Sequence, residues 1–424
     1  MKIVIHPEIL DRQRYSCNCC GQGCRSFLVP VKEKERQTIE QLRNWREQLG
    51  VGELYVQHRA AGGEGYGLNK REDGRCVFLD NKNLCSIHKL HGLKSKPVAC
   101  QLYPFVFTPW ADELRVGLRF DCPGVCSNQG KALSTYKTEL SHLAKQLMPG
   151  QAKMVEPPPI RRGQNVTIEQ FDYINEILLQ IVTAEAMELR QRLLWLHKFV
   201  DHLDRIKWQN VGEEDFTELM KMIQGGLLAE VQREVSKPEA VAGKPRKLLG
   251  QFFFLLCHPT TIITSEKNGL TEIFKKRIRD LKIIKNLGQV EGPLPKLQPD
   301  WPECDLRELE KSFGDWPVEV DQMLTRYLVC RIAGMGYCGP NFYNYGLVEG
   351  VRSMLLAVVT CGWLMRIEAV KAGRKTLEGA DAEKAVMTID GNLGYASALG
   401  SGPARLRLSY LSDYLEKLLI WYCH

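Results

Sequence analysis

The chain has 424 residues, of which 44% are hydrophobic and 25% are charged, so its composition is that of an ordinary folded protein rather than a disordered or fibrous one. At this length two or three domains are expected, because one hydrophobic core rarely organises so many residues. The 57 basic and 50 acidic side chains leave a net charge of only +7, which is too dilute for the basic stripe of a dedicated nucleic-acid-binding protein.

The sequence predicts a protein that is neither exported nor membrane-spanning. Its apolar start is broken by His6 and Pro7 and lacks a small-residue cleavage site. The longest apolar run, residues 353–365, has 13 residues, fewer than the roughly 20 that span a bilayer. We therefore expect a cytoplasmic location, where disulfides are disfavoured and clustered cysteines favour metal ligation or redox chemistry.

Residues 1–148 are expected to form a small cysteine-rich domain in which short strands alternate with turns. The segments 76–79 and 84–87 flank a turn and predict a β-hairpin. Such a hairpin would bring the thiols of Cys76 and Cys85 near each other.

A second hairpin is predicted from residues 105–107 and 114–120, and its far end leads directly into the pair of cysteines at 122–126. Residues 38–49 and 136–147 have the apolar spacing of amphipathic helices. The amino-terminal third is therefore expected to mix hairpins and short helices.

A helical domain is predicted over residues 166–424. It follows a proline-rich linker at 149–165, which contains three consecutive prolines, and it is interrupted by a loop at about 288–303. Apolar residues recur at helical spacing over residues 171–203, 323–332, 347–365 and 406–421, and Thr167 to Gln170 fits a capping box. The predicted fold class is mainly α (α+β), a small cysteine-rich amino-terminal module with short β-hairpins followed by a helical domain.

The cysteines are concentrated in the first 126 residues, which hold nine of the fifteen. Cys17 and Cys20 form a C-x-x-C pair, the spacing at which a tight turn directs two thiolates toward one metal ion, and Cys24 follows closely. The adjacent Cys19 and Cys20 cannot easily share one tetrahedral ion, so Cys19 is interpreted as the odd thiol.

Eight cysteines remain as predicted metal ligands: Cys17, Cys20, Cys24, Cys76, Cys85, Cys100, Cys122 and Cys126. Eight thiolates suit two closed four-ligand sites, or one iron–sulfur cluster and one zinc ion, and the sequence leaves zinc and iron–sulfur open. Basic side chains close in sequence would help to keep the thiols deprotonated: Arg25, Arg75, Lys94 and Lys96.

Other residues with ligand chemistry are interpreted differently. His88 and His91 are alternative ligands, but a histidine beside apolar residues is more often a packing residue. The later cysteines are far apart and mostly in apolar helical contexts, which favours core packing: Cys257, Cys304, Cys330, Cys338, Cys361 and Cys423.

Five sequence elements resemble the YkgJ-type cysteine-cluster family over about residues 14–126. They are C-x-x-C-G-x-x-C-R, C-V-F-L, C-S-I-H, K-P-x-x-C-Q-L-Y-P-F and C-P-G-V-C, in this order. The resemblance implies a zinc- or iron-chelating module whose ligands are the eight cysteines named above. Two positions depart from the family pattern: Gly23 stands where the family often has the first of a Cys-Cys pair, and Gln101 where it often has Arg. Cys19 is the expected substitute for the missing thiol.

A cysteine module followed by a helical region is also similar to the layout of flagellin lysine-N-methylases of the FliB type. The similar segments are Phe171-Asp172, residues 189–193 and residues 327–329. This resemblance implies an iron–sulfur-dependent transfer of methyl groups from S-adenosylmethionine to lysine side chains of a protein substrate. The glycine-rich stretches 61–67 and 400–402 lack the strand-turn-helix context of a nucleotide site and are interpreted as flexible loops.

Three functions follow from these patterns. The leading prediction is a metal-chelating module, structural or redox, whose helical domain binds a protein partner. The alternative is a protein lysine methyltransferase. Nucleic-acid binding through a zinc knuckle lacks a basic stripe with interleaved aromatic residues. No catalytic residue is predicted.

Overall fold

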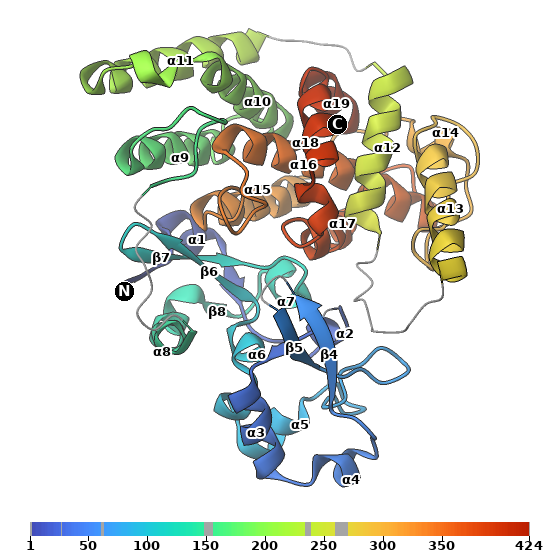
Figure 1. Cartoon of the computed structure of the whole chain (residues 1–424). Helices are drawn as coiled ribbons and strands as arrows, with labels where there is room; N and C mark the ends of the chain where they lie inside the picture. The colour runs from blue at the N-terminus through green and yellow to red at the C-terminus, as the bar shows by residue number, and fades with distance from the viewer. Residues whose placement is uncertain are drawn as a thin grey trace.

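The computed structural model describes residues 2–26, 28–60, 63–147, 156–233, 239–258 and 270–423. A large helical body lies above a smaller cysteine-rich module, which is coloured blue to teal in Figure 1. Short strands occur in the module, and helices dominate the rest of the described chain. The predicted class, mainly α with a small β-containing amino-terminal module, is confirmed.

The module contains three small sheets. Their strands are β1 (Lys2–Val4), β2 (Arg14–Tyr15), β3 (Pro30–Val31), β4 (Tyr55–Ala60), β5 (Gly63–Leu68), β6 (Phe105–Trp110), β7 (Glu113–Leu118) and β8 (Lys131–Ala132). The strand orders are β1-β7-β6, β2-β8 and β3-β5-β4, and only the β1–β7 pair is parallel among these strands. The hairpin predicted around residues 105–120 is therefore confirmed as β6 and β7, with Ala111 in left-handed backbone at its turn.

Short helices connect the sheets of the module. They are α1 (Pro7–Arg12), α2 (Gln22–Ser26), α3 (Glu33–Leu42), α4 (Trp45–Leu49), α5 (Ser86–His91), α6 (Val98–Leu102), α7 (Pro123–Cys126) and α8 (Lys137–Leu147), with single 3-10 turns η1 (Leu93–Ser95) and η2 (Leu133–Tyr136). The helix predicted over 136–147 is confirmed as α8. The prediction of one continuous helix over 38–49 is wrong, because extended backbone at Arg43 separates α3 from α4. The chain turns back there, and the indole N–H of Trp45 donates to the Ile39 carbonyl at 2.8 Å.

The hairpin predicted at 76–87 is only partly correct. Its turn forms, because the Asp80 carboxylate accepts from the N–H groups of Lys82 and Leu84 at 2.8 and 2.9 Å. Leu79 and Cys85 pair only as an isolated bridge, and the chain then enters α5 instead of a return strand.

The helical body consists of α9 (Ile168–Val182), α10 (Leu189–Arg205), α11 (Glu213–Arg233), α12 (Gly243–Cys257), α13 (Leu270–Leu287), α14 (Leu306–Leu309), α15 (Val318–Ala333), α16 (Leu347–Lys371), α17 (Gly379–Asn392), α18 (Gly402–Ser412) and α19 (Leu415–Tyr422), with η3 (Trp208–Asn210) and η4 (Ser397–Gly400). The capping box at Thr167 and Gln170 is confirmed by both of its hydrogen bonds. The helix expected over 406–421 is two helices, α18 and α19.

Two hydrophobic cores hold the described chain together. The large core runs from Ile5 to Cys423 and joins the β6–β7 hairpin to the helical body. Gly117 of β7 and Gly334 after α15 make this contact close, because a Cβ on Gly334 would lie 2.7 Å from the Gly117 Cα. The small core spans Val29 to Ile87 and lies within the module.

Part of the predicted linker lies against α16, because the carbonyl oxygen of Pro159 accepts from the N–H of Leu347. Residues 148–155 fall outside the described chain. The predicted boundaries at 149 and 165 stay predictions.

Helix α16 is the central helix of the body. By length and composition it passes as a membrane-spanning candidate, the single such helix among the described residues, and 89% of its most apolar stretch is buried inside the protein. Trp363 of α16 stacks on Phe253 of α12 with ring centroids 4.3 Å apart. Its apolar sequence is therefore explained by core packing.

Two loop predictions have different outcomes. No described helix or strand lies between α13 and α14, as predicted for 288–303, although Leu294 and Trp301 of this loop are buried. Residues 63–67 form part of β5, so their interpretation as a flexible loop was wrong, while residues 61–62 fall outside the described chain. Backbone pairing with β4 explains the difference, since a glycine-rich strand carries little side-chain signal.

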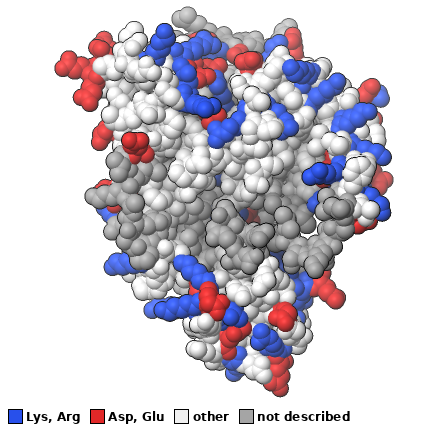
Figure 2. Space-filling view, in the orientation of Figure 1, with Lys and Arg blue, Asp and Glu red and all other residues white. Residues whose placement is uncertain are grey.

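Basic and acidic side chains are interspersed over the described part of the face in Figure 2. Neither the basic nor the acidic side chains form a continuous stripe there (Figure 2). The expectation that the protein lacks a nucleic-acid-binding surface stays a prediction.

Candidate metal centre

Four cysteines gather at the small core, and we call them the inner set: Cys24, Cys76, Cys85 and Cys100. They come from four places in the chain. Cys24 lies in α2, Cys76 in the turn after β5, Cys85 immediately before α5, and Cys100 in α6. The Cys76 N–H donates to the Cys24 carbonyl at 3.1 Å, which fixes α2 beside that turn.

The thiols of the inner set are close enough to affect one another electrostatically. Burial raises the pKa of Cys76 to about 12, and the neighbouring Cys24 and Cys85 sulfurs add to this rise. Burial likewise raises the pKa of Cys100, with further contributions from the other three thiols of the set. Negative charge on the neighbouring sulfurs therefore disfavours ionisation of Cys76 and Cys100, as expected for thiols that lie near one another.

Two lysines bring positive charge to the inner set. Lys96 opposes the rise in the pKa of Cys24 and of Cys100. Lys70 does the same for Cys24 and Cys76, and its half-buried ammonium donates to the carbonyl oxygens of Cys24 and Arg25 at 2.7 and 3.0 Å. Lys96 was among the predicted basic residues. Lys70 was missed, because it is brought to the site by pairing with Cys76 and not by a motif.

A second group of thiols, the outer set, lies beside the first: Cys17, Cys19, Cys20 and Cys122. The Cys19 thiol is in hydrogen-bonding contact with that of Cys17, and Cys20 contributes to the raised pKa of Cys122. Cys17 and Cys19 are exposed, Cys20 is half-buried and Cys122 is buried. The outer set is therefore open to solvent on one side.

Backbone N–H groups already point at three of these sulfurs. The donor lies two residues after each cysteine: Gln22 for Cys20 at 3.5 Å, Phe78 for Cys76 and Gly124 for Cys122. Such hydrogen bonds favour the charged form of a thiol and lower its pKa. They are also the outer-shell interactions that orient metal-bound thiolates. Both sets thus have a backbone prepared for thiolate charge.

Tyr103 contacts both α2, the helix that carries Cys24, and the thiol of Cys122. Its hydroxyl donates to Asp121 at 3.1 Å and also contacts the thiol of Cys122. Its ring packs on α2 so closely that a Cβ on Gly23 would lie 2.9 Å from it. Gly23, where the sequence departs from the family pattern, is therefore the residue that allows this contact. The sequence signal for Tyr103 was its place in the element K-P-x-x-C-Q-L-Y-P-F, three residues after Cys100, and this gave no role for its side chain.

Three predicted ligands or alternatives make other contacts, although Cys122 contributes to the raised pKa of one of them, Cys126. The Cys126 thiol is fully buried and donates to the Phe120 carbonyl at 3.0 Å, in the contact with the helical body. His88 is exposed, and burial of part of its ring together with Lys96 lowers its pKa. His91 packs edge-on against Trp45 with ring centroids 5.7 Å apart, which is the packing role expected for it.

Within the described residues, no three Cys, His, Asp or Glu side chains come together closely enough to hold a metal ion as they stand. The donor groups nevertheless fit a thiophilic metal. The inner set offers four thiols near one another, with two ammonium groups and a backbone N–H donor beside them, and thiolates are the ligands of zinc and of iron–sulfur clusters.

Comparison with known families gives the same chemistry. Residues 16–136 match the family described as "Putative zinc- or iron-chelating domain". The match covers every cysteine of the inner and outer sets, together with Cys126. No curated protein and no solved structure matches the chain.

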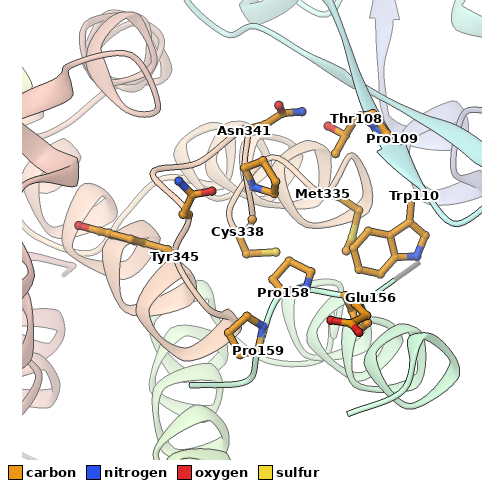
Figure 3. Close-up of a pocket in the computed structure, with 14 residues that line it drawn as sticks. Thr108, Pro109, Trp110, Glu156, Pro158, Pro159, Met335, Cys338, Asn341 and Tyr345 are labelled. Atoms are coloured by element: carbon orange, nitrogen blue, oxygen red, sulfur yellow. The ribbon is translucent and has the colours of Figure 1, made fainter. Parts of the chain in front are cut away.

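A cavity of about 440 Å³ lies elsewhere, between β6, residues 156–159 and the loop at 335–345 (Figure 3). Apolar groups dominate its lining, including Trp110 and Met335, and the Thr108 hydroxyl beside it is buried with no partner in the described structure. Among the described residues that line it, Cys338 carries the one thiol. The cavity has the size and lining of a small-molecule pocket, not of a metal site.

Five of the six later cysteines are buried, as predicted, and Cys304 is half-buried.

Proposed function

We propose that the cysteine-rich module binds zinc or iron at two centres, one held by the inner set and one by the outer set. The convergence of Cys24, Cys76, Cys85 and Cys100 from four separate elements carries this proposal. An ordinary core would gain nothing from placing four thiols together, since isolated buried cysteines pack as small hydrophobic residues.

The inner set has the character of a structural site. Four protein ligands would close the coordination shell, and the small core packs against these cysteines, of which Cys76 is buried and the other three are half-buried. A metal ion there would cross-link α2, the turn at Cys76, the start of α5 and α6. Because these elements are short, such a cross-link would supply stability that the small core alone provides only weakly.

The outer set has the character of an accessible site. Cys17 and Cys19 are exposed, and Cys20 and Cys122 receive N–H donors from Gln22 and Gly124. A zinc ion there would act as a Lewis acid or a cross-link, and an iron–sulfur cluster would transfer electrons. The exposure of Cys17 and Cys19 gives a partner access to this side of the module.

The proposal is tested by anaerobic purification of the full chain, followed by zinc, iron and acid-labile sulfide analysis with a visible spectrum. We expect two metal centres per chain. Cys100→Ser should remove one centre and Cys17→Ser the other, while Cys361→Ala, in the middle of α16, should keep both. A protein purified with neither zinc nor iron, or equal metal content in all three variants, would contradict the proposal.

The finer predictions rest on sequence resemblance. Membership of the YkgJ type fits the order of the cysteine elements, and the matched family description is broader than that. The lysine methyltransferase alternative needs S-adenosylmethionine and a protein substrate. A brown protein with acid-labile sulfide would favour this alternative. A colourless protein with stoichiometric zinc would count against it. Binding of a protein partner and a cytoplasmic location likewise remain proposals.

A further inference from the structure

The cysteine of the outer set that lies deepest is carried by a segment anchored to the helical body. The N–H groups of Phe120 and Asp121 both donate to one carboxylate oxygen of Asp390, at 2.7 and 3.2 Å. Asp390 lies in α17 and is almost fully buried. Its other oxygen pairs with Arg331 of α15. The backbone that leads into Cys122 is therefore attached to two helices of the body.

The segment is also held at its far end. The Arg326 guanidinium of α15 donates to the carbonyl oxygens of Val125 and Cys126 at 3.4 and 2.9 Å. It donates as well to the Gln13 side chain, whose amide donates to the same Val125 oxygen at 2.9 Å. Helix α7 therefore has its amino-terminal approach fixed by a carboxylate and its carboxyl-terminal end fixed by a guanidinium.

Cys122 stands between these two anchors. Its sulfur accepts from the N–H groups of Gly124 and Val125, so its orientation depends on the α7 backbone staying in place. The inner set is built differently, since the charged and N–H groups that face its thiols, Lys70, Lys96 and Phe78, all belong to the cysteine-rich module.

We propose that Asp390 is a positioning residue for the outer set, so that metal binding there is coupled to docking of the helical body, whereas the inner set binds its metal independently. This inference rests on the proposed function. Asp390 touches no thiol ligand; it acts by fixing the backbone at residues 120 and 121. Coupling of this kind is reciprocal, so metal at the outer set should in turn stabilise the contact of the module with α15 and α17.

The test compares Asp390→Asn with Asp321→Asn in the full chain. An asparagine at 390 offers one oxygen instead of two, so it cannot accept both from Arg331 and from the two backbone N–H groups. Asp321 is a matched control, because it pairs with the buried Arg192 and accepts from Thr325 within the helical body, away from α7. Both variants lose one carboxylate charge from an ion pair with an arginine of the helical body, although the Asp321 side chain is 28% exposed and that of Asp390 only 2%.

The measurement is the release of Zn²⁺, or of Co²⁺ loaded in its place and followed by its thiolate charge-transfer bands, after addition of a chelator. The parent protein should release two equivalents in two phases, and Cys17→Ser identifies the phase of the outer set. Asp390→Asn should accelerate that phase by up to about 10- to 100-fold, the range over which outer-shell changes alter metal affinity, and leave the other phase unchanged. Asp321→Asn should change neither phase.

Two results would overturn the inference. One is an outer-set phase in Asp390→Asn as slow as in the parent protein. The other is equal acceleration of both phases, which would indicate general loosening of the fold. Absence of bound metal in the parent protein would instead contradict the proposed function itself, so the two failures are distinguishable. Circular dichroism confirms that the variants compared are folded.

Discussion

Gly124 packs directly on the backbone of Ser16: a Cβ at Gly124 would lie 2.8 Å from the Ser16 carbonyl oxygen. This contact places the C-x-x-C turn that begins at Cys17 beside the N-terminal end of α7, and so brings together the two halves of the outer set. Backbone atoms cannot move aside as the end of a flexible side chain can. A side chain at position 124 would therefore push the two halves apart.

We expect Gly124→Ala to lose the metal of the outer set and to keep that of the inner set. The measurement is metal content per chain after purification in parallel with the parent protein. Gly52→Ala is the control, because nothing lies within 4 Å of a Cβ at that exposed position of the same module. Full metal content in Gly124→Ala would show that the close approach to Ser16 is unnecessary for the outer centre.

A second prediction decides which thiol is the eighth ligand. In the structure Cys19 contacts the Cys17 thiol, whereas the Cys126 thiol donates to Phe120 inside the contact with the helical body. Cys19→Ala should therefore lower the metal content of the outer set, and Cys126→Ala should retain it at a cost of about 1 kcal/mol for the lost hydrogen bond. Metal analysis and urea unfolding of both variants provide the check. The reverse order of metal loss would restore Cys126 as a ligand.

The helical body was largely predictable from local signals. The capping box at Thr167 and the spacing of Phe171, Ile174 and Leu178 required only that one face of a helix be buried, and the structure has that face in the large core. Predictions failed where backbone geometry was set by distant contacts. Residues 84–87 looked like a return strand, but Asp80 closes the preceding turn and α5 begins at Ser86.

The candidate metal centre was predictable in its chemistry but not in its grouping. Clustered cysteines indicated thiolate ligation, while the separation into an inner and an outer set depends on which core each segment joins. Sequence spacing placed Cys122 and Cys126 together as a pair, whereas the anchors Asp390 and Arg326 direct their thiols to different surroundings. Those anchors lie some two hundred residues or more along the chain from α7, beyond any local pattern.

The attachment of the final helix yields a stability prediction. Glu310 accepts from Arg246 at 3.1 Å and from the side chains of Trp421 and Tyr422 at 2.9 Å, so one carboxylate ties α19 to α12. Glu310→Ala leaves the buried Arg246 without its charge partner, and we expect a loss of about 3–5 kcal/mol in the free energy of unfolding. Glu303→Ala, which removes an exposed pair with Lys296, should cost less than about 1 kcal/mol. Urea unfolding of the two variants checks this, and similar losses in both would contradict it.

The last prediction concerns pH. His197 of α10 is buried, its Nδ1 lacks a partner in the described structure, and burial lowers its pKa despite the nearby Asp201. As pH falls below the ordinary histidine pKa of about 6.5, the unfolded chain binds a proton at this position before the folded protein does. The contribution of His197 to stability is therefore present above that pH and is lost as the pH falls toward the lowered pKa.

Between pH 7.5 and 5.5 the free energy of unfolding of the parent protein should fall more steeply than that of His197→Phe, by up to about 1.4 kcal/mol per pH unit. Urea unfolding at several pH values measures both slopes. Every other titrating group is common to the two proteins, so a difference between the slopes comes from His197. Equal slopes would mean that His197 takes up its proton as readily in the folded state as in the unfolded one.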